Sequence, residues 1–152
     1  MTDRPRILLV ASPGGHLQQM LALRHSWDGL ERRWATLDSV DTRTLLSDED
    51  VVICHGPTHR NPRNALRNLR VAWRTIRAFD PDVILSTGAA LAVPFFVIGK
   101  LTGRRLVYVE SLTRVEQLAL SGRLVYPLAH DFFVQWPQSA APRRARYVGS
   151  IL

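Results

Sequence analysis

Short apolar runs alternate with segments of helical periodicity along almost the whole chain, and this alternation restricts the fold more than any other feature. Runs such as RILLV at residues 6–10 and VVIC at residues 51–54 are apolar throughout, as strands are when both faces of a sheet are covered. Strands are predicted at residues 6–10, 34–37, 51–54, 82–85, 106–109, 132–134 and 146–148, and helices at 17–24, 64–79 and 92–102. This succession predicts an α/β fold with a Rossmann-like, doubly wound parallel sheet.

Length and composition indicate one globular domain with a preference for negative charge. The 152 residues, 46% of them hydrophobic and 22% charged, suffice for one core and are too few for two ordinary domains. We therefore expect a single domain over residues 1–152. With 20 basic and 13 acidic residues the net charge is +7, which favours a phosphate group, a nucleic acid or an acidic membrane surface as partner.

Several classes of protein are excluded by simple counts. The single cysteine, Cys54, allows no internal disulfide, and Cys54-His55 has no second ligand pair at metal-like spacing, so we expect no metal. No signal peptide is expected, and the longest apolar run, residues 89–99, is well short of the roughly 20 residues that span a bilayer. We expect a soluble or peripheral membrane protein of a reducing compartment.

Small residues follow the first predicted strand, at a position where parallel sheets bind ligands. Residues 11–16 read Ala-Ser-Pro-Gly-Gly-His, so Ser12, Gly14 and Gly15 can bring a helix N-terminus close to a phosphate. His16, at the start of that helix, is a candidate general base or phosphate contact. A plain glycine turn with an exposed histidine is the alternative.

The fourth and fifth predicted strands end in further candidate residues. Ser86, Thr87 and Gly88 form a second small-residue turn, and two such turns at one sheet edge predict a phosphate or diphosphate site. Glu110 and Ser111 follow the fifth strand, where a carboxylate can bind sugar hydroxyls or orient His16. For Glu110 the alternative is a solvated loop acid.

The helix predicted at residues 64–79 carries arginines at steps of three and four and no acid. The basic stripe consists of Arg63, Arg67, Arg70, Arg74 and Arg77. An apolar stripe of Leu66, Leu69, Trp73 and Ile76 runs beside it. This combination favours contact with an anionic membrane surface. The alternative is an amphipathic helix whose apolar face packs on the sheet and whose arginines are solvated.

The segment at residues 92–101, AVPFFVIGKL, is apolar on all sides. Such helices are usually buried between layers, which is the expectation here, and a membrane-dipping or subunit-contacting helix is the alternative. Gln135-Trp136-Pro137 and Tyr147-Val148-Gly149 are candidate interface residues, because Trp and Tyr are enriched at interfaces.

Three stretches together resemble a known family. They are ILLVASPGGHLQQM at residues 7–20, DVILSTGAALAVPFF at 82–96 and LVYVESLTRV at 106–115, followed by FFVQWP and YVG. In order and spacing they are similar to the membrane-associated subunit of the split UDP-N-acetylglucosamine transferase of asparagine-linked glycosylation, and to its bacterial counterparts in exopolysaccharide biosynthesis. A more distant likeness is to the N-terminal half of the peptidoglycan lipid-intermediate GlcNAc transferase.

The resemblance implies the N-terminal, acceptor-binding half-domain of a GT-B glycosyltransferase, peripheral on the cytoplasmic face of the cell membrane. It implies a donor-binding partner subunit, a UDP-sugar donor, and a polyprenyl-diphosphate-linked glycan as acceptor. The reaction implied is inverting transfer of a hexosyl or hexuronosyl group in polysaccharide biosynthesis, without a cofactor. At the matching positions His16 is the candidate base and Glu110 a second catalytic candidate, and the two glycine turns belong to the acceptor cleft.

Two other functions are weighed against this one. A basic nucleotide- or RNA-binding module without catalytic activity rests on the net charge and the arginine helix. It lacks an RNP-like aromatic pattern or a recognition-helix signature, so no nucleic-acid partner is expected. A complete small sugar-nucleotide enzyme is disfavoured, because only one Rossmann-like unit fits in the chain.

Overall fold

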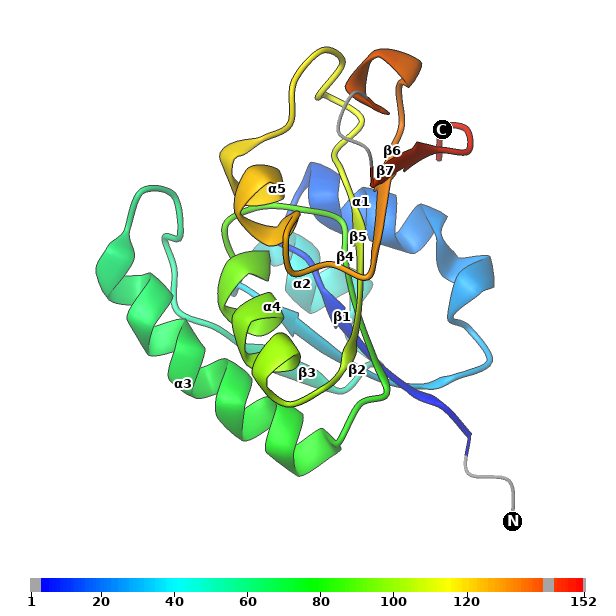
Figure 1. Ribbon diagram of the computed structural model, residues 1–152. Helices are drawn as coiled ribbons and strands as arrows, with labels where there is room; N and C mark the ends of the chain where they lie inside the picture. The colour runs from blue at the N-terminus through cyan, green and yellow to red at the C-terminus, as the bar shows by residue number, and fades with distance from the viewer. Residues whose placement is uncertain (1–3, 141–143, 152) are drawn as a thin grey trace.

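The computed structural model describes residues 4–140 and 144–151, which contain one sheet of parallel strands (Figure 1). Its strands are β1 (Arg6–Val10), β2 (Glu31–Thr36), β3 (Val51–Ile53), β4 (Val83–Ser86), β5 (Arg105–Val109), β6 (Asp131–Val134) and β7 (Ala145–Tyr147). The order across the sheet is β3-β2-β1-β4-β5-β6-β7, and all neighbours are parallel. Strand β1 lies inside the sheet. Strands β2 and β3 extend the sheet on one side of β1, and β4 to β7 extend it on the other. The predicted doubly wound sheet is therefore confirmed.

The helices connect successive strands. They are α1 (Gly15–Ala22), α2 (Val40–Leu45), α3 (Pro62–Phe79), α4 (Ala92–Leu101) and α5 (Leu120–Val125), with 3-10 turns at Arg24–Ser26 and Pro137–Ala140. The three longest agree with the sequence prediction to within two residues at each end. Helices α2 and α5 are absent from that prediction, because six residues are too few to show helical periodicity.

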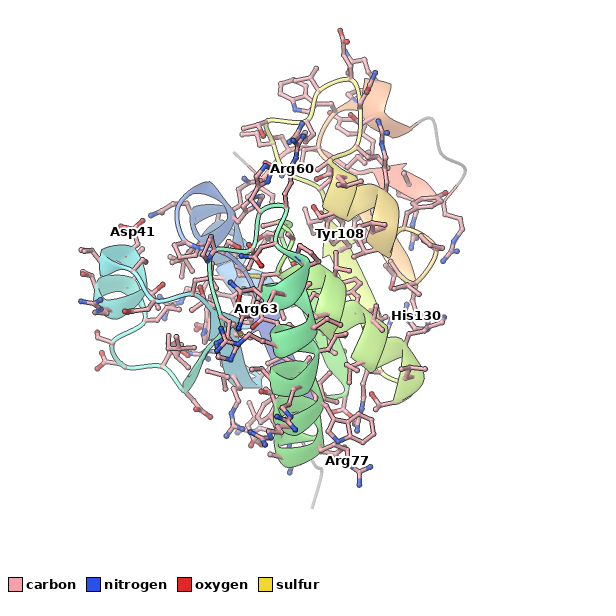
Figure 2. The ribbon with its side chains drawn as sticks, turned by 90° about the vertical axis from the view of Figure 1, so that its left-hand side faces the viewer. Asp41, Arg60, Arg63, Arg77, Tyr108 and His130 are labelled. Atoms are coloured by element: carbon pink, nitrogen blue, oxygen red, sulfur yellow. The ribbon has the colours of Figure 1, made fainter. Side chains whose placement is uncertain are left out.

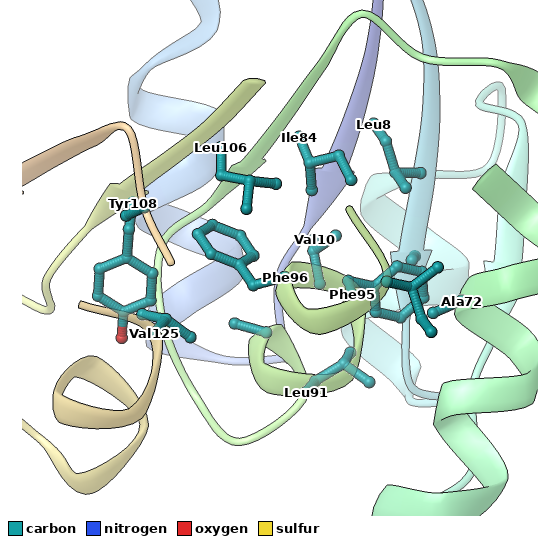
Figure 3. Packing of buried hydrophobic residues seen from close by; sticks show 14 of the residues in the cluster. Leu8, Val10, Ala72, Ile84, Leu91, Phe95, Phe96, Leu106, Tyr108 and Val125 are labelled. Atoms are coloured by element: carbon teal, nitrogen blue, oxygen red, sulfur yellow. The ribbon is translucent and has the colours of Figure 1, made fainter. Parts of the chain in front are cut away.

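Helices α3, α4 and α5 cover one face of the sheet, and the larger core lies beneath them (Figure 3). Phe95 and Phe96 of α4 are fully buried in this core, together with Ile84 of β4 and Leu106 of β5. A Cβ at Gly99 would lie 2.6 Å from Leu106 and 2.7 Å from Ile84, so glycine lets α4 approach the sheet closely. The expectation that residues 92–101 form a buried helix is confirmed.

The opposite face of the sheet is covered in part by α1 and the segment that follows it. Here the Trp27 and Trp34 rings meet edge-to-face, with their centroids 5.4 Å apart. Over β4, β5 and β6 the same face forms an apolar groove of about 420 Å³. Its walls include Val83, Val107 and Phe133 of these strands, and residues 148–151 form one edge. No helix within the described ranges is long and apolar enough to cross a bilayer.

Helix α3 packs on the sheet with only half of its apolar stripe. Ile76 is fully buried and Leu69 packs against the core, whereas Leu66 and Trp73 are 69% and 47% exposed. The buried face consists of Asn64, Asn68, Ala72, Thr75, Ile76 and Phe79. Asn68 is buried because its side chain donates to the His55 carbonyl at 2.9 Å and accepts from the His55 N–H at 2.8 Å. These bonds satisfy the backbone of the loop that precedes α3.

We predict that Phe96→Ala lowers the free energy of unfolding by about 3–5 kcal/mol, because it deletes a fully buried ring that meets Tyr108 edge-to-face. Denaturant unfolding followed by circular dichroism measures the change. The control is Leu101→Ala in the same helix, where the side chain is 75% exposed and the expected loss is below about 0.5 kcal/mol. Equal losses at the two positions would contradict the burial of α4.

Candidate functional site

The sheet reverses its winding between β1 and β4, and the loops that leave these strands diverge (Figure 1). β1 leads to α1 on one face, and β4 leads to α4 on the other. In open α/β sheets such a switch point leaves a crevice at the carboxyl ends of the strands, where ligands bind. The two predicted small-residue turns lie on either side of this crevice.

Two hydrogen bonds tie these turns together. Nδ1 of His16 lies 2.9 Å from the Thr87 carbonyl oxygen, and Thr87 Oγ1 donates to the His16 carbonyl at 2.6 Å. A carbonyl oxygen only accepts, so Nδ1 carries the proton in the neutral ring and Nε2 keeps its lone pair. His16 also lines a pocket. The arrangement suits Nε2 for general-base chemistry on a bound ligand.

The turn after β4 is shaped around the His16 ring. Gly88 has a φ of +118°, and a Cβ there would lie 2.9 Å from Cε1 and Nδ1 of His16. Ser86 Oγ accepts from the Gly88 N–H at 3.2 Å. Ser86 and Thr87 are fully buried, so in this structure they support the turn and His16 from beneath. Direct ligand contact by Ser86, Thr87 and Gly88 stays a prediction.

The turn after β1 leaves the start of α1 open. Gly14 is the N-cap with a φ of +83°, and no side chain caps the helix there. Gly15, the first helical residue, is exposed. Ser12 lies deeper, and its buried Oγ has no hydrogen-bond partner in the part of the chain that is described. Uncapped first-turn N–H groups can bind an anion, so the predicted phosphate role of this turn is geometrically possible.

A pocket of about 320 Å³ opens beside His16. Two cationic side chains, Arg60 and Arg114, line it from loops that are distant in the sequence. Ser111, in the same loop as Arg114, also lines the pocket. The other lining residues are Thr58, His59, Ala89, Ala90, Val93, Thr113, Ala119, Leu120, Ser121 and Leu124. Sequence reasoning assigned neither Arg60 nor Arg114 to this site. Arg114 could have been assigned to the site from the sequence, because it lies four residues after Glu110 in the loop that follows the fifth strand.

Glu110 is only 1% exposed, and its carboxylate holds the loop that follows. Oε1 accepts from the Ser111 N–H at 2.9 Å, and Oε2 accepts from the Ala119 N–H at 3.0 Å. A Cβ at Gly122 would lie 2.2 Å from Oε2, so glycine makes room for the carboxylate. Burial raises the pKa of Glu110, and the two amide bonds counteract this only in part. Glu110 thereby holds both ends of the loop at residues 111–119, which contributes to the lining of the pocket.

The expectation that Glu110 orients His16 is wrong. The Thr87 carbonyl holds the His16 ring, and backbone amides occupy the Glu110 carboxylate. Its burial equally excludes the alternative of a solvated loop acid. Ser111 does lie at the pocket, where its Oγ is 3.0 Å from Oγ1 of Thr113.

Exposed arginines extend along α3, and Figure 2 shows Arg63 and Arg77 towards its two ends. This arginine face consists of Arg63, Arg67, Arg70, Arg74 and Arg77. Within residues 4–140 and 144–151 none of the five forms an ion pair, whereas arginines elsewhere do, as Arg33 does with Asp50 at 2.7 Å. Leu66 and Trp73 lie exposed among them. The result is a positive surface that is also apolar.

A family model described as "Oligosaccharide biosynthesis protein Alg14 like" matches residues 55–151. The chain belongs to the Alg14 family. The "UDP-N-acetylglucosamine transferase subunit ALG14" of Yarrowia lipolytica is 38% identical to it, over 99% of this chain and 82% of that protein. The ALG14 subunit of Eremothecium gossypii is 41% identical, over 62% of this chain and 45% of its own length. This Alg14-family chain thus spans less than half of the latter relative.

Solved structures confirm the predicted Rossmann-like GT-B half-domain. MurG of Acinetobacter baumannii matches with a TM-score of 0.79 and 16% identity, over 94% of the Alg14-family chain and 45% of MurG. A UDP-N-acetylglucosamine 2-epimerase of Rickettsia bellii matches with a TM-score of 0.71 and 7% identity, over 98% of the chain and 46% of the epimerase. At such identities the likeness shows the fold alone, which is that of about half of each larger protein.

The buried carboxyl group predicts a pH-dependent stability. Because burial raises the pKa of Glu110 above its ordinary value of 4.5, the folded chain keeps a proton that the unfolded chain releases. This contribution is complete below about pH 4.5 and is lost as the pH rises through the raised pKa. We predict that the free energy of unfolding of the wild type, relative to Glu110→Gln, falls over that range. Urea denaturation at stepped pH measures this difference.

The control for this pH series is Glu116→Gln, which alters an exposed carboxyl group of the same loop. Any change with pH that the two variants share is then a general effect of removing a carboxyl group from this loop. A profile for Glu110→Gln that does not change with pH would contradict the raised pKa.

Proposed function

We propose that this chain is the acceptor-binding subunit of a two-chain glycosyltransferase. It binds a polyprenyl-diphosphate-linked glycan at the cytoplasmic face of the membrane, and a partner chain supplies the UDP-sugar. The observation that carries the proposal is the His16–Thr87 pair, which leaves Nε2 unprotonated on a residue of a pocket with two arginines. The ALG14 relatives are named subunits of a UDP-N-acetylglucosamine transferase, which makes N-acetylglucosamine the first sugar to test.

In the proposed reaction the acceptor hydroxyl oxygen attacks the anomeric carbon of the UDP-sugar, and the bond from that carbon to UDP breaks. Attack from the opposite side inverts the anomeric configuration. Nε2 of His16 takes the hydroxyl proton while UDP departs as an anion. The Nδ1–H bond to the Thr87 carbonyl stabilises the imidazolium that forms. General-base assistance of this kind contributes about 10²–10⁴ in rate.

The pocket lining combines the charged and apolar groups that binding of a lipid-linked diphosphate requires. Arg60 and Arg114 supply positive charge, and an arginine can bind phosphate oxygens in a bidentate manner. Exposed Leu120 and Leu124 of α5, with Val93 of α4, supply an apolar wall. The lining of this pocket therefore offers groups that suit a sugar, a diphosphate and an alkyl chain.

The arginine face supports membrane association of the same subunit. Arginines attract anionic lipid headgroups, and Leu66 and Trp73 among them can enter the interface between headgroups and acyl chains. Helix α3 begins two residues after Arg60, so this surface adjoins the pocket. A lipid-linked acceptor then reaches the pocket from the membrane without leaving it entirely.

The apolar groove over β4–β6 supports a partner chain. Strands of doubly wound sheets are normally covered on both faces, yet Val83, Val107 and Phe133 are only partly buried there. The relatives' description as subunits fits a donor-binding chain that covers this face. We place the partner's contact at the groove and at residues 148–151 along its edge.

We predict that His16→Ala lowers kcat by at least about 10²-fold in the reconstituted complex, because it removes the proposed base. Transfer of labelled N-acetylglucosamine from its UDP donor to a polyprenyl-diphosphate acceptor measures the rate. The control is His25→Ala, which removes an exposed histidine of the 3-10 turn at Arg24–Ser26. Wild-type rates for His16→Ala would exclude His16 as the base, and robust transfer by this chain alone would contradict a two-chain enzyme.

We predict that the triple change Arg67→Gln, Arg70→Gln and Arg74→Gln weakens binding to phosphatidylglycerol vesicles about 100-fold, since each arginine near such a surface contributes about 1 kcal/mol. Vesicle co-sedimentation measures the affinity. The matched control removes the same charge from ion-paired arginines elsewhere, namely Arg24, Arg33 and Arg43. Equal weakening by the two triples would exclude a specific membrane face. Tighter binding to RNA than to vesicles would favour the basic RNA-binding module.

A further inference from the structure

Two buried glutamines join segments that are far apart in the sequence. Gln19 lies on α1, one turn after His16, and Gln135 lies at the end of β6. Gln135 Nε2 donates to Gln19 Oε1 at 2.7 Å and to the Glu110 carbonyl at 3.0 Å. Gln135 Oε1 accepts from the Ile151 N–H at 3.1 Å. One amide group therefore connects the groove edge to α1.

Gln19 continues the connection to the pocket loop. Its Oε1 also accepts from the Leu112 N–H at 3.0 Å, and its Nε2 donates to the Gly15 carbonyl at 3.3 Å and to Ser111 Oγ at 3.4 Å. Backbone N–H groups only donate and backbone carbonyls only accept, so both side-chain amides have a single orientation that satisfies their partners. The bonds from Gln135 and from the Leu112 N–H thus meet at one atom, Gln19 Oε1, which joins the segment that ends at residue 151 to the pocket loop.

The same loop is tied to the segment after β6 by further bonds. Trp136 Nε1 donates to the Leu112 carbonyl at 2.6 Å, and Ser139 Oγ lies 2.9 Å from the Arg114 carbonyl. Leu112 is therefore held at its N–H by Gln19 and at its carbonyl by Trp136. Because of these bonds, a displacement of the segment after β6 would also displace the pocket loop, two residues of which, Ser111 and Arg114, line the pocket.

We propose that Gln135 and Gln19 form a hydrogen-bond relay that couples residues 148–151, at the groove, to residues 111–114 and the start of α1, at the pocket. When residues 148–151 lie in the groove, the relay holds the loop at residues 111–114 in place. When they are displaced, the loop becomes more mobile. The functional role of this coupling rests on the proposed function, in which a partner chain bound in the groove would change the position of the loop at the acceptor pocket. Glutamine suits the relay because one planar group both donates and accepts, so each side chain holds more than one segment at once.

Amide hydrogen exchange, resolved by NMR on the isolated chain, tests the relay without any assay of sugar transfer. Ile151→Pro removes the N–H that Gln135 accepts, and Ile151→Ala keeps it while shortening the side chain. We predict that Ile151→Pro speeds exchange of the Leu112 amide about threefold to tenfold, and that Ile151→Ala leaves it unchanged. Unchanged exchange at Leu112 in both variants, or equal acceleration in both, would overturn the relay.

A second variant interrupts the relay in its middle. Gln135→Glu preserves the shape and keeps an oxygen for the Ile151 N–H, but it places an oxygen where Nε2 donates to Gln19 and to the Glu110 carbonyl, so exchange at Leu112 is expected to rise by about tenfold or more. Ser39→Ala is the control for general loosening, because it frees the Thr42 amide at the start of α2, outside the lining of both the pocket and the groove, and is expected to leave Leu112 protected. Unchanged exchange at Leu112 in Gln135→Glu would overturn the relay. These results stand whether or not His16 proves to be the base, so failure of the proposed function is recognised separately.

Discussion

The reciprocal hydrogen bonds between His16 and Thr87 are the interaction on which the candidate site depends. They join the turns that leave β1 and β4, which the strand order makes neighbours but which lead to opposite faces of the sheet. Without this tie the crevice would separate the two turns. With it, the His16 ring is held at Nδ1, and Nε2 remains available to a ligand. The close approach also explains Gly88, because a larger residue would meet the ring.

Around this pair, buried polar side chains hold loops by their backbone. Glu110 closes residues 111–119, Asn68 holds the loop before α3, and Gln19 and Gln135 connect the pocket loop with the groove. These loops bring Arg60 and Arg114 to one pocket. Most of the remaining acids pair with arginines of other segments, which leaves the arginine face uncompensated. Positive charge is thereby concentrated along α3, whose first turn adjoins the pocket, and an anionic lipid would approach there.

The sequence predicts the parts of this structure that depend on local patterns. Apolar strands and small-residue turns are such patterns, so the sheet, the turn with His16 and the position of Ser111 were all predictable. The burial of Asn68 on the packing face of α3 was not, because its side chain satisfies the backbone of His55, thirteen residues away. The role of Glu110 likewise depends on Ala119, and the pairing of Gln19 with Gln135 spans 116 residues. Propensity and periodicity carry no information about such distant backbone partners.

The most direct measurement of the central claim is the tautomer of His16, read from the imidazole ¹⁵N shifts of the selectively labelled chain. In the neutral ring the bond to the Thr87 carbonyl requires a protonated Nδ1 and an unprotonated Nε2. Addition of a polyprenyl-diphosphate sugar is expected to perturb the Nε2 resonance and to leave Nδ1 protonated. A neutral ring with its proton on Nε2 would contradict the account, because His16 could not then accept the proton of an acceptor hydroxyl at the pocket.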